Sequence, residues 1–253
     1  MEDLLSGKKH PSSSNPIPRV ITVANQKGGV GKTTTAINVA TCLAEIGNKV
    51  LIVDFDPQAN ATSAVGIEPG TFQESIYEIL LEQSDINKCI LSTEWTGLSI
   101  APATRDLSGA EIELVSAFNR ERFLKNVIEK VIDQYDYVFI DCPPSIGLLT
   151  VNALTAADEV LVPIQCEYLA LEGLGQLLSN VEKVKTHLNE RLHISMIALV
   201  MFDGRTKLST QVVQEVRGHF GDKVCNQIIP RSVRLSEAPS YGQPIIYLSL
   251  IHI

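Results

Sequence analysis

The stretch NQKGGVGKTTT, residues 25–35, combines three closely spaced glycines with two lysines and a run of threonines. The general pattern GxxxxGK[ST] places backbone N–H groups and the start of a helix around phosphates. Gly31, Lys32 and Thr33 supply the second half of this pattern, whereas Gln26 stands where its first glycine is expected. The stretch therefore predicts a phosphate-binding loop, with Lys32 on the phosphates and the Thr33 hydroxyl on Mg²⁺.

Three aspartates follow apolar stretches of the chain. Asp54 and Asp56 come directly after residues 49–53, and Asp141 comes directly after residues 137–140. Phosphoryl transfer needs a carboxylate to hold hydrated Mg²⁺ and another polar group to orient the attacking water. A single acid after a strand is often only a cap. Three of them, together with a phosphate loop, predict a Mg²⁺-dependent nucleotide site.

Alternating strands and helices are expected to position these residues. Helical spacing or length is found in residues 33–46 and 169–188, and short apolar stretches predict buried strands at residues 20–24, 49–53, 137–140, 159–163 and 194–201. Nearly continuous apolar strands that alternate with helices predict a parallel sheet covered on both faces. Such sheets bind ligands in the loops at the carboxyl ends of their strands. We therefore expect an α/β fold of the P-loop NTPase type, with a doubly wound, mostly parallel sheet.

The composition is that of one globular domain, with 253 residues, 45% hydrophobic and 20% charged. No apolar run approaches the roughly 18 residues of a membrane span, and no hydrophobic signal core begins the chain, so we expect a cytoplasmic protein. The five cysteines form no CxxC pair, which argues against a zinc site or a disulfide framework. A Ser/Pro-rich leader, residues 1–18, is expected to be disordered, and the domain is expected at residues 19–247.

The net charge of −8 argues against a protein that coats nucleic acid with its whole surface. Residues 200–253 differ from the rest, because they hold six lysines and arginines against four acids. Any anion-binding face is therefore expected in the C-terminal part of the chain.

KGGVGKTT, residues 27–34, resembles the deviant Walker A motif of the ParA/MinD-type ATPases. The resemblance implies that the nucleotide is bound by Lys27, Gly28, Gly29, Val30, Gly31, Lys32, Thr33 and Thr34. In that family the first lysine reaches the phosphates of a nucleotide held by a partner subunit, so that two ATP molecules are sandwiched in a dimer. Lys32 is then expected to serve its own nucleotide and Lys27 that of the neighbour. Lys27 would act as a cation supplied in trans, comparable in logic to an arginine finger.

Two further stretches resemble the switches of this family. DFDPQANAT, residues 54–62, is similar to switch I, and DCPPS, residues 141–145, is similar to switch II. The resemblance implies that Asp56 positions the hydrolytic water, that Asp141 binds Mg²⁺ through water, and that Asp54 supports the metal shell. ATP and Mg²⁺ are the expected cofactors. Cys142 is interpreted as a small residue of switch II and not as a nucleophile.

Residues 167–174, 201–206 and 229–245 are similar to the Soj branch, the chromosomal ParA proteins, and the whole resemblance runs from about residue 19 to residue 246. In that branch the arginines that match Arg205 and Arg234 contact DNA without sequence preference, as phosphate-binding residues would. The segment around Pro230 and Arg231 lines the adenine side. The resemblance implies a homodimer that forms on ATP and binds non-specific double-stranded DNA, so the protein is expected to associate with the nucleoid. It also implies a role in chromosome or plasmid segregation with a ParB-like partner.

Alternatives remain open. A MinD-like membrane-cycling ATPase shares the loop but needs a C-terminal amphipathic helix, and a regulatory module would use ATP as a switch without significant turnover. An iron–sulfur reductase is disfavoured, because no cysteine arrangement suits a shared cluster. Residues 248–253, LSLIHI, stand where similar proteins continue into a terminal helix, so we expect a non-native tail there. The leader lacks the helix-turn-helix extension of plasmid ParA repressors, which argues against operator-specific binding.

Overall fold

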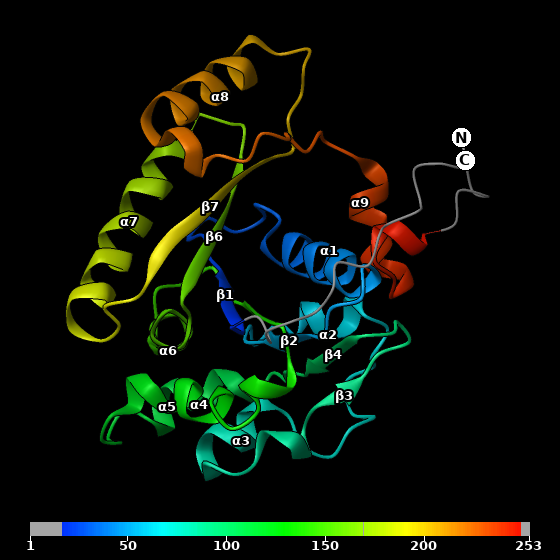
Figure 1. Ribbon diagram of the computed structural model, residues 1–253, viewed down its shortest axis with the longest axis vertical. Helices are drawn as coiled ribbons and strands as arrows, with labels where there is room; N and C mark the ends of the chain where they lie inside the picture. Colours follow the sequence, from blue (N-terminus) through cyan, green and yellow to red (C-terminus); the bar gives the residue numbers. More distant parts are fainter. Residues whose placement is uncertain (1–16, 169, 249–253) are drawn as a thin grey trace.

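The computed structural model describes residues 17–168 and 170–248, within which helices flank one seven-stranded sheet on both faces (Figure 1). The strands are β1 (Arg19–Val23), β2 (Val50–Asp54), β3 (Leu91–Ser92), β4 (Leu98–Ala101), β5 (Tyr137–Asp141), β6 (Glu159–Gln165) and β7 (His193–Val200). The α-helices are α1 (Lys32–Glu45), α2 (Asn60–Ala64), α3 (Ile76–Glu82), α4 (Leu107–Glu113), α5 (Phe123–Ile128), α6 (Leu148–Ala156), α7 (Ala170–His187), α8 (Lys207–Phe220) and α9 (Val233–Glu237). The 3₁₀ helices are η1 (Ile86–Lys88), η2 (Arg120–Arg122), η3 (Ile132–Gln134), η4 (Gly221–Lys223), η5 (Ala238–Tyr241) and η6 (Ile245–Tyr247).

The strand order is β3-β4-β2-β5-β1-β6-β7. Every neighbouring pair is parallel except the short edge strand β3, which runs antiparallel to β4. Helices connect most of the parallel strands, as parallel pairing requires. The predicted α/β class with a mostly parallel sheet is confirmed.

Both faces of the sheet are buried, because side chains of consecutive residues point to opposite faces of a strand. In β2, Val50 and Ile52 belong to one hydrophobic cluster, which contains side chains of α1 and α2. Leu51 and Val53 belong to the other, which contains side chains of α3 to α8. This explains why the strand reads as a continuous apolar run and not as an alternating one.

Element boundaries differ from the predicted ones by one or two residues. Asp54 belongs to β2 because it pairs with Asp141 of β5. β7 ends at Val200, one residue before the predicted end, since Met201 has a φ of 52° in the left-handed region. The predicted helix 169–188 is α7, whose first predicted residue lies outside the described residues. No strand was predicted where β3 and β4 occur.

The register of the sheet places the ends of three strands at one edge. Val23 of β1 and Asp54 of β2 both pair with Asp141 of β5. The loops that follow these strands therefore begin side by side, and this edge holds most of the predicted site.

Parts of the predicted termini lie outside the described residues, namely 1–16 of the leader and 249–253 of the tail. The described C-terminal segment packs against the domain, since Ile245 N donates to Asn38 Oδ1 (2.8 Å) and the Tyr247 ring stacks on Trp95 with ring centres 5.6 Å apart. Among the helices in the described ranges, none combines the length and apolar character needed to cross a membrane.

Candidate functional site

The loop between β1 and α1 leaves open space for an anion. Gly29 and Gly31 have φ values of 72° and 79°, which only glycine adopts at little cost. A Cβ added at Gly28 or Gly29 would meet no atom within 4 Å. In the described structure, Gly31 is the N-cap residue of α1, which has no side-chain cap and no acid in its first turn. Its first N–H groups are therefore left for a negatively charged ligand.

Lys32 is a buried cation at the base of this loop. Its side chain is enclosed, with only 7% of the residue exposed, and its Nζ donates to the Lys27 carbonyl oxygen (3.3 Å). Burial lowers the pKa of Lys32, and the charge of Asp141 acts in the opposite direction. A cation kept in this position, with one backbone partner, fits the predicted contact to phosphates of its own nucleotide.

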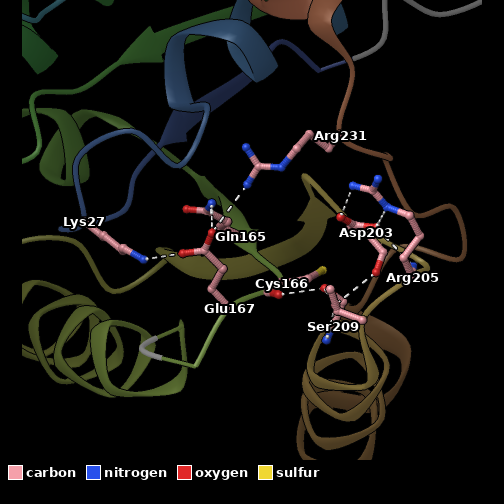
Figure 2. A network of polar contacts seen from close by, with 9 residues as sticks. Lys27, Gln165, Cys166, Glu167, Asp203, Arg205, Ser209 and Arg231 are labelled. Carbon is pink, nitrogen blue, oxygen red and sulfur yellow. Dashed lines mark hydrogen bonds and ion pairs between the residues drawn. The ribbon is translucent and has the colours of Figure 1, made fainter.

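Lys27 divides its backbone and its side chain between two tasks. Its N–H donates to Asn25 Oδ1 (3.0 Å), and its carbonyl oxygen accepts from Lys32, so the backbone belongs to the loop. The side chain leaves the loop and forms an ion pair with Glu167 (3.4 Å), beyond the end of β6 (Figure 2). The Lys27 side chain is 33% exposed.

Asp141 carries an unsatisfied buried carboxylate at the end of β5. The residue is fully buried, and neither of its carboxylate oxygens has a hydrogen-bond partner among the described residues. Burial, reinforced by the nearby charge of Asp54, raises the pKa of Asp141 well above its usual value. The Thr33 hydroxyl lies close enough to lower that pKa, without completing a regular hydrogen bond. Buried acids of this kind are usually satisfied by a ligand, a water or an ion.

The donor set around Asp141 fits Mg²⁺ that is shared with a nucleotide. Within residues 17–168 and 170–248, no cluster of three or more His, Cys, Asp or Glu side chains could hold a metal alone. Mg²⁺ commonly takes one or two protein oxygens and completes its shell with waters and phosphate oxygens. The Thr33 hydroxyl would supply a protein oxygen directly, and the Asp141 carboxylate would hold a water of the metal shell.

Asp54 already has hydrogen-bond partners in the described structure. Its Oδ2 accepts from the Thr62 N–H (2.8 Å) and hydroxyl (2.7 Å), and its Oδ1 accepts from Asp56 N (3.3 Å). Burial raises the pKa of Asp54 to about 6 against these hydrogen bonds. Asp54 therefore holds the segment 56–62 on the end of β2, and its predicted support of the metal shell stays a prediction.

Asp56 and Cys142 flank this centre. Asp56 is buried, and its Oδ1 accepts from Gln58 N (2.9 Å), which leaves Oδ2 for another donor. Cys142 is buried too, and burial raises the pKa of its thiol well above the usual value. A thiol that stays protonated is a poor nucleophile, which agrees with the packing role expected of Cys142.

The predicted adenine-side segment joins the same network from the C-terminal part. Pro230 forms an isolated parallel β-bridge with Phe202, and Arg231 N donates to the Phe202 carbonyl oxygen (3.0 Å). The Arg231 guanidinium contacts Glu167 (3.4 Å), whose carboxylate also accepts from Gln165 (2.5 Å). Figure 2 shows Lys27 and Arg231 reaching Glu167 from two different elements.

The two predicted DNA-binding arginines lie on different segments, and each is paired with an acid. Arg205, in the loop between β7 and α8, donates twice to Asp203, from Nε (2.9 Å) and Nη2 (2.7 Å). Arg234 lies on α9, away from α8 in Figure 1, and its Nη1 contacts Glu237 (3.1 Å). Each arginine is thus held by a nearby acid of its own segment.

Two acids with evident partners carried no predicted role. Glu167 and Asp203 lie two and three residues after the ends of β6 and β7, much as Asp56 lies two residues after β2. That position was the available signal, together with the D-x-R spacing of Asp203 and Arg205. The partners themselves are set by tertiary contacts over 140 and 64 positions of the chain, for Lys27 and Arg231 with Glu167, which no local pattern contains.

Comparisons with known sequences agree with this geometry. A protein-family model described as an AAA domain matches residues 18–194. The sporulation initiation inhibitor protein Soj of Bacillus subtilis (strain 168) is 55% identical over 228 residues, which cover 90% of each chain. The chromosome partitioning protein ParA of Myxococcus xanthus (strain DK1622) is 53% identical over 230 residues, which cover 91% of this chain and 81% of that protein.

Solved structures agree as well. Cobyrinic acid a,c-diamide synthase from Mycobacterium smegmatis, with bound ATP analog and magnesium, is 37% identical with a TM-score of 0.81, over 89% of this chain and 93% of that chain. A putative plasmid partition protein from Borrelia burgdorferi B31, bound to AMPPNP, is 29% identical with a TM-score of 0.76, over 89% and 90% of the two chains. The expected P-loop fold is thereby confirmed, and the expected cofactors are of the kind that these homologous structures hold. The chain belongs to the ParA/Soj family of chromosome-partitioning ATPases.

Proposed function

We propose that this protein hydrolyses ATP as a homodimer that forms on ATP, and that the dimer binds DNA without sequence preference. A ParB-like partner then stimulates hydrolysis and releases the DNA. The protein would act in the cytoplasm at the nucleoid, in chromosome or plasmid segregation. The relatives named as partitioning or partition proteins support the general role. The division of labour between the two loop lysines supports the dimer.

The observation that carries the proposal is the direction of the Lys27 side chain. Its own loop uses the Lys27 backbone, and the buried Lys32 already stands at the base of that loop. A second amine in the same cradle would face repulsion from Lys32, whereas the observed amine is partly exposed and pairs with Glu167. If the Lys27 amine left Glu167, it could instead contact the phosphates of a nucleotide on a second subunit. In that position it would stabilise the charge that develops on the transferred phosphoryl group.

Each remaining residue of the centre has a task that its surroundings allow. The N–H groups of residues 28–34 bind the phosphates, and Lys32 neutralises part of their charge. Thr33, directly, and Asp141, through water, would hold Mg²⁺, which would offset the charge on the phosphates. Asp56 accepts a hydrogen bond from the attacking water through Oδ2 and orients it. Pro230 and Arg231 border the base.

DNA binding would use the exposed Arg205 and the partly exposed Arg234, whose guanidinium groups can reach phosphates. Two subunits bring two copies of each arginine to one DNA molecule. An acidic protein can then bind DNA only in the dimeric state, because the few bases of one subunit give a weak contact. The rival membrane-cycling role predicts that ATP drives binding to anionic liposomes and not to DNA.

The test is Lys27→Ala, studied by sedimentation velocity with an ATP analogue that resists hydrolysis. We expect nucleotide binding to the monomer within about twofold of the parent, because Lys32 and the loop backbone remain. We expect dimerisation and steady-state ATP hydrolysis to be lost.

Lys88→Ala is the matched control, since it removes the same charge from an exposed position on η1, away from the loop. It should dimerise and hydrolyse ATP like the parent. A Lys27→Ala variant that dimerises normally on ATP would show that this lysine does not act in trans.

A further inference from the structure

The exposed Arg205 already holds a carboxylate in the geometry of a phosphate. Its Nε and Nη2 donate to the two oxygens of Asp203, at 2.9 and 2.7 Å. Paired donors of this kind suit carboxylates and phosphates alike. Because Arg205 is 88% exposed, the pair is also open to exchange with a ligand from solution. The two N–H donors with which Arg205 could bind a phosphate are thus occupied by an acid two residues away.

We propose that Asp203 is a competitor built into the chain, which occupies Arg205 and must be displaced by a DNA phosphate before Arg205 contributes to binding. The proposal rests on the DNA contact of Arg205 proposed above. Asp203 would then lower the affinity for DNA, also in the monomer, which makes few DNA contacts. The pair does not abolish binding, because exposed ion pairs are weak and exchange readily.

The same loop is tied to the nucleotide side of the molecule. Phe202 N donates to the Ile229 carbonyl oxygen (3.1 Å), and Arg231 N donates to the Phe202 carbonyl oxygen (3.0 Å). Asp203 directly follows Phe202, and the charge of Arg231 helps to lower the pKa of Asp203, after the larger effect of Arg205. Figure 2 shows Arg231 and the Asp203–Arg205 pair close together. A nucleotide that engages Pro230 and Arg231 therefore acts on the strand-end segment that carries Asp203, so the exchange at Arg205 is placed where it can respond to the nucleotide.

An exchange of partners leaves a specific mark on the salt dependence of DNA binding. A phosphate that is neutralised by a cationic side chain releases about 0.9 cation. If Arg205 must leave Asp203, the freed carboxylate attracts a cation back from solution, so the net release is smaller. Without the carboxylate, the slope of log K against log[salt] should become steeper. A residue with a purely structural role would not move this slope.

The experiment compares the parent protein with Asp203→Asn by fluorescence anisotropy, on two unrelated duplexes at several salt concentrations, with ATP analogue and with ADP. In the parent, the backbone N–H of Arg205 donates to Asp203 Oδ1 (3.0 Å). Asparagine keeps an oxygen that can accept this hydrogen bond, so the turn should be preserved. We expect affinity to rise by about two- to fivefold per subunit. The salt slope should steepen by up to about 0.9 per subunit. The ratio of affinities with ATP analogue and with ADP should rise, since the dimer gains this factor in both subunits and the monomer gains it in one.

Two further variants make the result specific. In an Arg205→Gln background, the Asp203→Asn substitution should change affinity and slope no more than Asp222→Asn does, because Asp203 no longer has an arginine to occupy; this closes a double-mutant cycle. Asp222→Asn changes the net charge by the same amount at the other end of α8 and should raise affinity far less.

The outcomes separate the inference from the function on which it rests. If Arg205→Gln weakens DNA binding but Asp203→Asn leaves affinity and slope unchanged, the competitor is wrong and the DNA contact stands. If Asp203→Asn weakens binding, Asp203 aligns Arg205 for DNA, and the inference is again overturned. If Arg205→Gln has no effect on DNA binding, the contact and the competitor both fail.

Discussion

Asp141 and Arg205 show how differently this chain treats two charged groups. Asp141 is fully buried, and its carboxylate has no hydrogen-bond partner among the described residues. Arg205 is 88% exposed and makes a two-point contact to Asp203. The centre at the strand ends keeps an unsatisfied charge inside, whereas the C-terminal part keeps satisfied charges outside.

The difference agrees with what each region is proposed to bind. A buried, unpaired carboxylate raises the free energy of the ligand-free protein. A ligand that pairs with this carboxylate removes the penalty, so it is bound more tightly and in one geometry. An exposed ion pair costs little to form or to exchange, so a ligand bound there is held weakly and released easily. Chemistry needs the first arrangement, and reversible attachment to a long polymer needs the second. Substitutions in the two regions should therefore have effects that differ in magnitude and in the property they change.

The largest effect is expected from Lys32→Ala, in the buried region. This variant loses the cation at the base of the loop and leaves the negative charges of Asp141 and Asp56 uncompensated beside the phosphates. ATP affinity should fall by about 100-fold or more, since charged hydrogen bonds of this kind contribute roughly 1.5–3 kcal/mol each. Isothermal titration calorimetry with ATP measures it. An affinity within a few-fold of the parent would mean that the backbone cradle alone holds the nucleotide.

Asp56→Ala should change the rate and spare the binding. The substitution removes the carboxylate expected to orient the attacking water, while the loop and Asp141 remain. Turnover should fall by about 100-fold or more, and the ATP-bound dimer and its DNA complex should persist for longer. Single-turnover phosphate release and dissociation of labelled DNA report the two quantities. Parent-like turnover would remove Asp56 from the mechanism.

A smaller and different effect is expected from Arg205→Glu and Arg234→Glu, in the C-terminal part. Each should weaken binding to unrelated duplexes by a similar factor of roughly tenfold, because phosphate contacts carry little sequence information. The slope of log K against log[salt] should become shallower by about 0.9 per lost contact, and only in the ATP state should it be steep in the parent. Nucleotide affinity should not change. Fluorescence anisotropy with ATP analogue and with ADP decides this, since equal slopes in the two states would refute the nucleotide switch.

The same contrast separates what the sequence could predict from what it could not. The loop 25–35 and the ends of β2 and β5 were predicted because each is a local pattern, an apolar strand followed by glycines or acids. Burial of both sheet faces keeps these strands continuously apolar, which makes them easy to find. β4, with four residues after the turn at Gly97, is too short to stand out, and β3 has only two residues.

Pairing was the part that no pattern contained. The bond from Thr62 to Asp54 closes over 8 positions, and the pair between Lys27 and Glu167 spans 140. Asp54 was therefore assigned to the metal shell from resemblance alone, although its oxygens are occupied by Thr62 and Asp56. A motif identifies the side chains of a site, and only the fold shows which of them still have an oxygen or an amine to offer.

The smallest effect is expected from Asp141→Asn, which tests the contrast directly through stability. Asparagine removes the buried charge, so the nucleotide-free variant should be more stable than the parent by about 1 kcal/mol, or roughly 2–4 °C in Tm for a domain of this size. The pKa of Asp141 is raised in the folded state, so the folded parent binds more protons than the unfolded chain between the unfolded and folded pKa values, and its stability falls as pH rises through that interval. The advantage of the variant should accordingly grow with pH and vanish in acid. Addition of Mg²⁺ with an ATP analogue should reverse the order, because only the parent gains a ligand on this carboxylate. Thermal unfolding at several pH values, with and without nucleotide, measures all three effects. A nucleotide-free variant that is less stable than the parent at every pH would mean that Asp141 holds the fold together, and the contrast between the buried centre and the exposed arginines would have to be abandoned.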